Sequence, residues 1–500
     1  MAKICLCLTA KTLARNLEVL EDNRKYIDIA ELRVDCLDPD ERFLIRRFPE
    51  MAGLPVILTI RRGIEGGHFV GGEGSRIALL AKGLAYAVMD KRRNFAYVDL
   101  EEDLDVPGLE EAARAFGTRI IRSWHNMDGV GDDLALRLRR LRRVGDELVK
   151  VAVTPRSVDD VIKLYRTAKE TADVDKILLG MGGYSTNTRV LADFLGSKIT
   201  YAFPGGESDL VQTGLGQFDP KELVELYRLR SITPKTKVFA VTGYPLKVTD
   251  SPHFFNTAFK MEQIDAVYVP IPSDSIVSLL SLAQEIGISG ISVTFPHKEK
   301  VLPFLAFKSE QVEEIGACNT VVASPNGWRG YNTDATAFSD SLLSFTGWKD
   351  FRRRKVTIIG AGGAAKAVAF QVFRLRGKAL VLNRTVARAR NLAQLYHFDW
   401  AGFDSRGTDL IEKYSDLIIQ TSSVGMESGQ DPLEFYKFSG RETVMDLIYK
   451  PERTSFLKRA EEAGCRVLSG KDMFHRQARI QYGYYMNKEF PASLISRAGL

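Results

Sequence analysis

The chain has 500 residues, of which 45% are hydrophobic and 26% are charged. Single hydrophobic cores stop growing at about 250 to 300 residues, so this length predicts about three domains, and the composition excludes a disordered, collagen-like or coiled-coil protein. A formal net charge of +6 is a mild bias that forms no basic stripe, so we expect no nucleic-acid partner.

Cysteine usage and hydropathy bear on the cellular compartment. The five cysteines are few, odd in number and scattered, which argues against a disulfide framework and indicates a reducing environment. Cys5 and Cys7 lack a second Cys or His pair at ligand spacing, so we predict core packing and no metal site. We find no transmembrane stretch, signal peptide or transit segment and predict a cytoplasmic protein; a plastid protein with its transit peptide removed would have the same features.

The first 205 residues repeat one unit, a short apolar run followed by a longer amphipathic stretch. One such stretch, residues 137–143, interleaves leucines with arginines as a helix with a solvated face does. The predicted strands are residues 4–9, 28–35, 56–62, 96–102, 119–126, 148–153, 177–181 and 199–203. Parallel strands need helical crossovers and eight strands close a sheet, so the fold class is α/β with a (β/α)8 barrel over residues 1–228.

Polar side chains gather where these strands end. The residues concerned are Glu31, Arg33, Asp35, Arg61, Arg62, Asp99, Glu101, His125 and Lys150. Because barrels of this class carry their chemistry at the carboxyl ends of the strands, the pattern predicts an active site there.

A second αβ region begins after a break at residues 230–234, where a helical segment ends and Pro234 precedes an apolar strand at 237–242. This region, residues 237–345, is followed by a restart of the pattern at Lys355. A strand, a glycine turn, a helix and a further strand at 379–383 then form one βαβ unit, which predicts a Rossmann domain over residues 351–469.

The glycine turn predicts a dinucleotide site. Gly360 permits the tight turn, and Gly362 lets the backbone approach a pyrophosphate that lies on the helix N-terminus, where Gly363 and Ala364 follow. The third glycine of the usual pattern is Ala365, an allowed replacement.

The end of the next strand predicts which dinucleotide is bound. An acidic residue there would bind the ribose hydroxyls of NAD, but this chain has Asn383, Arg384 and Thr385, with Arg388 one helical step further on. Because a guanidinium can donate two hydrogen bonds to a 2′-phosphate, we predict NADP(H) as the cofactor.

Two sets of motifs resemble known families. The second half resembles shikimate dehydrogenase at 241–245, 249–256, 292–298, 316–321, 330–334, the glycine turn, 383–385 and 446–449. The barrel half resembles type I 3-dehydroquinate dehydratase at 31–33, 59–61, 65–67, 123–125, 149–150, 188–189 and 213–217. Together these resemblances cover nearly the whole chain and imply two consecutive enzymes of aromatic biosynthesis.

In the barrel, the resemblance implies that Lys150 forms a Schiff base with the ketone of 3-dehydroquinate. Desolvation in its apolar run and neighbouring cations should favour the nucleophilic amine. His125 shuttles protons, and we expect Glu101 to orient it. Arg189 clamps the substrate carboxylate, while further residues surround the ring: Glu31, Arg33, Arg61, Thr213 and Gln217. Thr213 stands where the family usually has Ser, and Glu65 begins a glycine-containing loop.

In the second half, the resemblance implies that Lys298 and Asp334 form the acid/base pair. Thr249 and Ser251 are expected to form hydrogen bonds with the substrate carboxylate. The ring hydroxyls are expected to form hydrogen bonds with Thr294, Asn319, Asp334 and Gln477. Tyr449 and Gly470 line the cleft, and Met473 faces the nicotinamide from C-terminal helices at 470–497 that complete the substrate domain. Ser292 replaces the commoner Asn, which leaves its contact with substrate open.

The function implied is dehydration of 3-dehydroquinate followed by NADPH-dependent reduction of 3-dehydroshikimate to shikimate. The alternative is a catalytically inactive regulator that senses quinate or shikimate, and a narrower one is quinate oxidation with NAD. Retention of both lysines, His125 and Asp334 disfavours the regulator, because a sensor needs no imine-forming lysine. The partners expected are these small molecules, with no membrane; the oligomeric state is left open.

Overall fold

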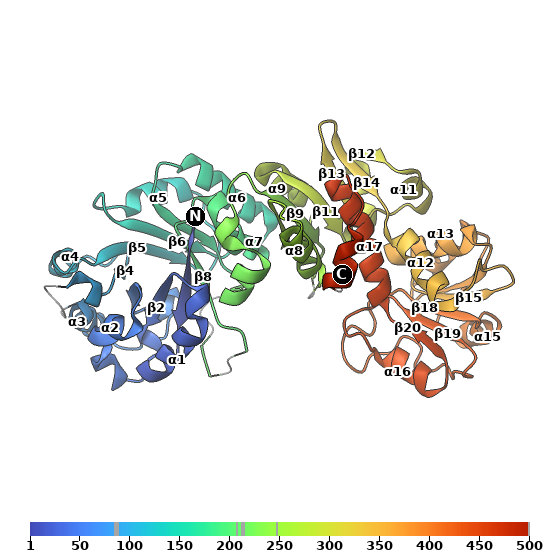
Figure 1. Ribbon diagram of the computed structural model, residues 1–500, viewed down its shortest axis with the longest axis horizontal. Coiled ribbons are helices and arrows are strands. Elements are labelled where there is room, and N and C mark those ends of the chain that lie inside the picture. The colour runs from blue at the N-terminus through green and yellow to red at the C-terminus, as the bar shows by residue number, and fades with distance from the viewer. Residues whose placement is uncertain (85–89, 207–208, 212–215, 247–248, 499–500) are drawn as a thin grey trace. The chain divides into compact units, whose positions relative to one another are not determined.

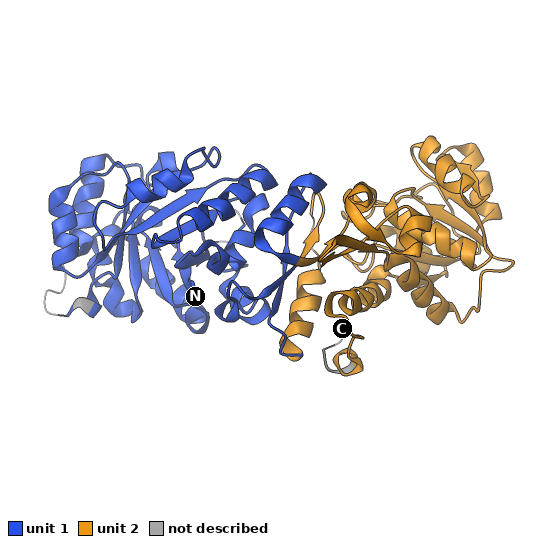
Figure 2. Cartoon of the chain, turned by 90° about the horizontal axis from the view of Figure 1, so that it is seen from above, with its two compact units in different colours: residues 1–239, 262–288 blue, residues 240–261, 289–500 orange. Residues whose placement is uncertain are grey.

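The computed structural model describes residues 1–84, 90–206, 209–211, 216–246 and 249–498 (Figure 1). The chain divides into two compact units, one formed by residues 1–239 with 262–288 and the other by 240–261 with 289–500 (Figure 2). None of the helices in the described part of the chain combines the length and the apolar character that a membrane crossing requires.

The N-terminal sheet confirms the predicted barrel. Its strands are β1 (Lys3–Leu8), β2 (Ile29–Arg33), β3 (Val56–Thr59), β4 (Tyr97–Glu101), β5 (Arg119–Asn126), β6 (Leu148–Val153), β7 (Lys176–Gly180) and β8 (Ile199–Ala202). They follow one another in the order β7-β6-β5-β4-β3-β2-β1-β8, and all paired neighbours run parallel. Between β7 and β8 a bridge from Lys176 to Ser197 nearly closes the barrel.

Helices alternate with these strands: α1 (Leu13–Asn23), α2 (Phe48–Ala52), α3 (Glu73–Leu84), α4 (Pro107–Ala115), α5 (Leu134–Leu141), α6 (Val158–Glu170) and α7 (Asn187–Val190). Thr12 and Ser157 begin α1 and α6 by accepting a hydrogen bond from a backbone N–H of the first turn. In α5, Leu138 and Leu141 are buried and Arg139 pairs with Asp173, as the amphipathic pattern predicts, whereas Leu136 is exposed.

The second sheet is mixed. Its strands are β9 (Lys237–Thr242), β10 (Ala266–Pro270), β11 (Ile288–Val293), β12 (Leu305–Lys308), β13 (Thr320–Ser324) and β14 (Gly327–Tyr331), in the order β10-β9-β11-β13-β14-β12. β13 runs antiparallel to both β11 and β14. The helices are α8 (Ser251–Met261), α9 (Ile276–Ile286), α10 (His297–Lys300), α11 (Glu310–Ile315) and α12 (Asp334–Thr346).

Residues 262–288 belong to the first compact unit because α9 packs against α6 of the barrel. Ser278 donates a hydrogen bond to Asp159, and Glu285 pairs with both Arg166 and Lys169. The domain boundaries expected from the sequence, which place these residues in the second domain, stay a prediction.

The third sheet is parallel throughout and has the order β17-β16-β15-β18-β19-β20. Its strands are β15 (Lys355–Ile359), β16 (Lys378–Leu382), β17 (Asp399–Ala401), β18 (Leu417–Gln420), β19 (Thr443–Asp446) and β20 (Arg466–Leu468). This is the Rossmann order, in which the strand order reverses between β15 and β18, and ligands bind at that point.

The helices of this part are α13 (Gly363–Arg374), α14 (Val386–Gln394), α15 (Ser405–Lys413), α16 (Ser455–Glu462), α17 (Gly470–Met486) and α18 (Ala492–Ala498). α17 leaves the Rossmann sheet and packs against α12 and α8, so the C-terminal segment returns to the preceding domain.

Two candidate active sites

The carboxyl ends of the barrel strands surround a pocket. Sequence-predicted residues that line it are Glu31, Arg33, Arg61, His125, Lys150, Arg189 and Gln217. Cys7, Glu65 and Tyr201 line it as well. Thr213 lies outside the described residues. Strand alternation places Glu31, Arg33, His125 and Lys150 inward because every second residue of a strand faces the barrel interior. Arg189 enters the pocket from α7, and Gln217 from the segment after β8.

Lys150 is held by carboxylates. Its Nζ donates a hydrogen bond to Asp99 Oδ2 at 2.9 Å and lies 3.6 Å from Glu31 Oε1. The sequence led us to expect neighbouring cations at Lys150, but the charged groups nearest to its Nζ are the carboxylates of Asp99 and Glu31. Nucleophilic attack requires that the amine first give up a proton.

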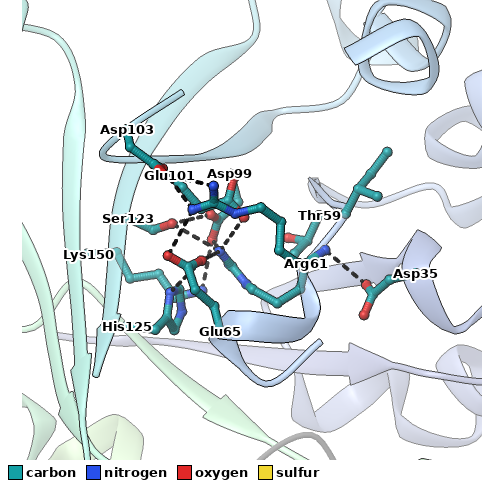
Figure 3. Close-up of polar contacts among 12 residues, drawn as sticks. Asp35, Thr59, Arg61, Glu65, Asp99, Glu101, Asp103, Ser123, His125 and Lys150 are labelled. Atoms are coloured by element: carbon teal, nitrogen blue, oxygen red, sulfur yellow. Dashed lines mark hydrogen bonds and ion pairs between the residues drawn. The ribbon is translucent and has the colours of Figure 1, made fainter. Parts of the chain in front are cut away.

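His125 lies beside Glu65, with 3.6 Å between Nδ1 and Glu65 Oε2 (Figure 3). Burial, then the charges of Arg61 and Lys150, lower the pKa of His125 well below its ordinary value. The imidazole is therefore neutral at neutral pH and can accept a proton.

Glu101 does not orient His125, contrary to the expectation from sequence. Its two carboxylate oxygens accept hydrogen bonds from Arg61, at 2.9 Å, and from Arg76, at 2.6 Å. Glu65, from the loop after β3, is the carboxylate near His125, but 3.6 Å is too long for a hydrogen bond, and His125 Nδ1 has no hydrogen-bond partner among the described residues.

Arg61 connects the polar groups beneath the pocket (Figure 3). Its guanidinium contacts Asp99 at 2.8 Å, Glu101 at 2.9 Å, Glu65 at 3.2 Å and Ser123 at 3.2 Å. These four protein groups occupy the hydrogen-bond donors of the guanidinium. Arg61 therefore fixes the positions of Asp99, which lies next to Lys150, and of Glu65, which lies next to His125.

Three further predicted residues differ in how their polar groups are engaged. Arg33 pairs with Asp35 at 2.7 Å, and Glu31 accepts a hydrogen bond from Thr59 at 2.9 Å. Gln217 donates to Cys7 Sγ, while its Oε1 is buried and has no partner in the described part of the chain.

Arg189, on α7, is a buried cation for which the described residues provide no ion pair. Burial lowers its pKa to about 10, so it remains charged at neutral pH. A buried guanidinium without a protein anion is costly, which favours binding of an anionic ligand in the pocket.

In the second unit, Lys298 and Asp334 meet as a close pair. Lys298 Nζ, on α10, lies 2.5 Å from Asp334 Oδ2, at the start of α12. Asn319 donates to the other carboxylate oxygen at 2.9 Å. Both oxygens of Asp334 are therefore held, which fixes the position of the lysine ammonium.

Three hydroxyls predicted to bind substrate lie together. Tyr449 donates to Thr249 Oγ1 at 3.1 Å, and Thr249 lies 3.1 Å from Ser251 Oγ. Tyr449 stacks on Phe474 with ring centroids 4.6 Å apart. Of the other predicted residues, Gln477 accepts a long 3.5 Å hydrogen bond from Thr333, and Thr294 is half-buried.

Ser292 is engaged by the returning helix α17. Its Oγ lies 2.9 Å from both Gln481 Oε1 and the Tyr485 hydroxyl. Gln481 also donates to Thr320 at 3.0 Å. These two α17 residues were not predicted from the sequence, although they follow Gln477 at four-residue spacing on the same helix face.

The glycine turn fits a dinucleotide. Gly360 has φ +113°, and a Cβ there would lie 2.6 Å from Thr421 Oγ1. Gly362 precedes α13, and a Cβ on it would meet no atom within 4 Å, so the backbone is open to a ligand at the helix N-terminus. The turn follows β15, within the predicted βαβ unit, at the switch point between β15 and β18.

Gly363 contacts the lysine of the acid/base pair. A Cβ at this position would lie 3.0 Å from both Cβ and Cδ of Lys298. Nearby, Lys366 of α13 pairs with Glu299 of α10 at 2.8 Å. The start of the nucleotide-binding helix therefore packs directly on the stem of Lys298.

The residues expected to choose the cofactor follow β16. Asn383 stands at the strand end, where an NAD-binding protein has an acidic residue, and it donates a hydrogen bond to the Thr385 carbonyl at 3.0 Å. Arg384 and Arg388 are exposed, and the described part of the chain gives them no ion pair. This arrangement suits a phosphate rather than a bare ribose.

Gly470 and Met473 lie in packed surroundings at the start of α17. A Cβ on Gly470 would lie 2.3 Å from the Leu447 carbonyl oxygen, so close packing requires glycine. Met473 is 6% exposed and belongs to the same core cluster as Ala361 in the glycine turn. Its contact with a cofactor stays a prediction.

Comparison with known proteins assigns both halves. Residues 4–234 match the family model described as type I 3-dehydroquinase, and residues 241–321 match the shikimate dehydrogenase substrate binding domain. Similar proteins include the chloroplastic bifunctional 3-dehydroquinate dehydratase/shikimate dehydrogenase of Arabidopsis thaliana, 29% identical over 492 residues, which are 93% of this chain and 79% of that protein.

The second half alone matches monofunctional enzymes. The shikimate dehydrogenase (NADP(+)) of Caldanaerobacter subterraneus subsp. tengcongensis is 36% identical over 271 residues, covering 52% of this chain and 96% of the relative. A crystal structure of the Aquifex aeolicus shikimate dehydrogenase is 30% identical, with a TM-score of 0.49, covering 54% of this chain and 99% of that one. The chain belongs to the family of bifunctional proteins that join a type I 3-dehydroquinase to a shikimate dehydrogenase.

Proposed function

We propose that the chain removes water from 3-dehydroquinate in the barrel and then reduces 3-dehydroshikimate to shikimate with NADPH. The observation that carries this proposal is the barrel pocket, which presents an amine, a neutral imidazole and a buried guanidinium to one cavity. Nothing in the comparisons or in the two sites supports an inactive regulator.

The dehydration begins with Lys150. Its amine, after losing a proton, attacks the ketone carbon, and the carbonyl oxygen leaves as water when the C=N bond forms. The protonated imine withdraws electrons, so His125 can take the adjacent C–H proton. Electrons from that bond form a C=C bond as the C1 hydroxyl departs with a proton from His125, and hydrolysis of the imine returns the amine.

The remaining pocket residues position the substrate. Arg189 binds the carboxylate, while Glu31, Gln217 and Thr213 bind ring hydroxyls, and Arg33 acts through its pair with Asp35. Asp99 holds Lys150 in place, and Glu65 lies beside His125. Each role is chemically matched to the substrate, which carries one carboxylate and several hydroxyls.

In the second site, Lys298 donates a proton to the substrate carbonyl oxygen and Asp334 keeps the ammonium aligned. Thr249 and Ser251 bind the carboxylate; Asn319, Thr294, Gln477 and Tyr449 surround the ring. Bound NADPH supplies the hydride. The glycine turn, residues 360–364, would hold its pyrophosphate, residues 383–385 with Arg388 its 2′-phosphate, and Gly470 and Met473 its nicotinamide side.

We also propose the domain limits 1–228, 237–345 with the C-terminal helices 470–497, and 351–469, and a cytoplasmic location. The location is supported by the five cysteines, which form no disulfide.

The role of Lys150 is tested by Lys150→Ala. Borohydride added with 3-dehydroquinate should attach substrate mass to the native chain and none to the variant, because only an imine is reduced onto the protein. Dehydration should fall by at least ~1,000-fold, as when other enzyme nucleophiles are removed. Shikimate oxidation with NADP+ serves as the folding control and should be retained; a variant that still dehydrates would disprove the mechanism.

The pH dependence of dehydration should reflect the lowered pKa of His125. Protonation removes the base, and a lowered pKa means that protonation occurs only at lower pH. The acidic limb of kcat/KM, measured from about pH 4 to 9, should therefore lie well below the ordinary histidine pKa of about 6.5. An acidic limb at or above that value would contradict the neutral imidazole.

Gly363→Ala and Gly362→Ala should separate two functions of the glycine turn. Gly363→Ala places a methyl group against the side chain of Lys298 and displaces its ammonium group. The kcat for shikimate oxidation should therefore fall by up to about 100-fold, with little change in NADP+ affinity. Gly362→Ala places a methyl group in the open space at the N-terminus of α13, where the pyrophosphate would bind, and should weaken NADP+ binding. Equal effects of both variants on affinity alone would count against the Lys298 contact.

Arg384→Asp should penalise NADPH selectively. Loss of a charge-assisted contact and added repulsion should raise KM for NADPH by roughly 10- to 100-fold and leave the weaker NADH reaction nearly unchanged. Arg390→Asp, an exposed change of equal charge on α14, is the matched control. If both cofactors respond alike to Arg384→Asp, this residue is no phosphate clamp.

A further inference from the structure

Tyr201, near the end of β8, projects into the barrel pocket. The residue is 4% exposed, and its hydroxyl has no hydrogen-bond partner among the residues that the structure describes. Its ring lies under Lys150, with 4.5 Å between Nζ and the ring centroid. A buried hydroxyl that lacks a partner among the described residues is unfavourable, which favours an acceptor from a ligand in the pocket.

Two other buried tyrosines of the barrel do have partners. Tyr26 donates to Glu225 at 2.8 Å, and Tyr165 donates to Asn187 at 2.8 Å. Tyr201 therefore differs from tyrosines whose hydroxyls only stabilise the fold.

Tyr201 shares this property with Arg189 in the same pocket. Burial, then the nearby carboxylate of Glu31, raises the pKa of Tyr201 well above its ordinary value, so the phenol remains a neutral donor. Tyr201 and Arg189 both line the pocket, and Thr200, the neighbour of Tyr201 on β8, donates a hydrogen bond to the Arg189 carbonyl at 3.0 Å, which ties the two residues together. Two donors that face one cavity without a protein acceptor suit an acceptor with two oxygens.

We propose that Tyr201 donates a second hydrogen bond to the substrate carboxylate held by Arg189. This inference rests on the proposed dehydration. A carboxylate offers lone pairs to both the guanidinium and the phenol, whereas the buried Gln217 Oε1 is itself an acceptor and suits a ring hydroxyl. The aromatic ring meanwhile supports the cationic nitrogen of Lys150.

Tyr201→Phe tests the hydroxyl and retains the ring. Dehydration is followed without NADPH, so that only the barrel reaction contributes. KM for 3-dehydroquinate should rise roughly tenfold, as expected for loss of a hydrogen bond to a charged group, with kcat changed less than about threefold. Tyr26→Phe loses a buried hydroxyl contact outside the pocket and should lower Tm without raising KM.

A double-mutant cycle with Arg189→Lys locates the contact. If both donors bind one carboxylate, their combined effect on KM should depart from the product of the single effects, because groups that share a partner are coupled. A Tyr201→Phe protein with unchanged KM, or two strictly independent effects, would overturn the proposal. If the unsubstituted chain fails to dehydrate, the proposed function itself fails, which is a separate result.

Discussion

The barrel site depends on one buried carboxylate, Asp99, which neutralises two cations. Arg61 lies 2.8 Å and Lys150 2.9 Å from the same oxygen, while Ser123 donates to the other. Burial raises the pKa of Asp99, but Arg61 and then Lys150 together outweigh burial and lower it well below its ordinary value. Removal of Asp99 would take away the carboxylate closest to both cations and leave Arg61 with Glu101 and Glu65, and Lys150 with Glu31 at 3.6 Å. Loss of one partner from a buried ion pair costs about 3 to 5 kcal/mol.

The second site uses the same arrangement with different chemistry. Asp334 holds Lys298, and Asn319 holds Asp334, so a carboxylate again fixes a lysine ammonium. In the proposed mechanism the barrel lysine attacks a carbonyl carbon, whereas this lysine donates a proton to a carbonyl oxygen. The contact between Gly363 and Lys298 adds a link from the nucleotide-binding turn to the proton donor.

The sequence was sufficient for the folds and for most of the site. The predicted eight strands of the barrel appear within a few residues of their expected limits because β-branched runs and buried faces define them locally. Contacts between strands were harder: the position of Asp99 next to Lys150 depends on how β4, β5 and β6 are aligned. Glu65, rather than Glu101, lies at His125 because a loop folds back, and loop paths leave no periodic signal.

The central claim is that one chain carries out both reactions in sequence. It is tested most directly by supplying 3-dehydroquinate and NADPH to the purified protein and measuring both shikimate formation and NADPH oxidation. The account predicts one NADPH oxidised and one shikimate formed for each 3-dehydroquinate consumed. Formation of 3-dehydroshikimate without NADPH oxidation, or no consumption of 3-dehydroquinate while added 3-dehydroshikimate is still reduced, would contradict it.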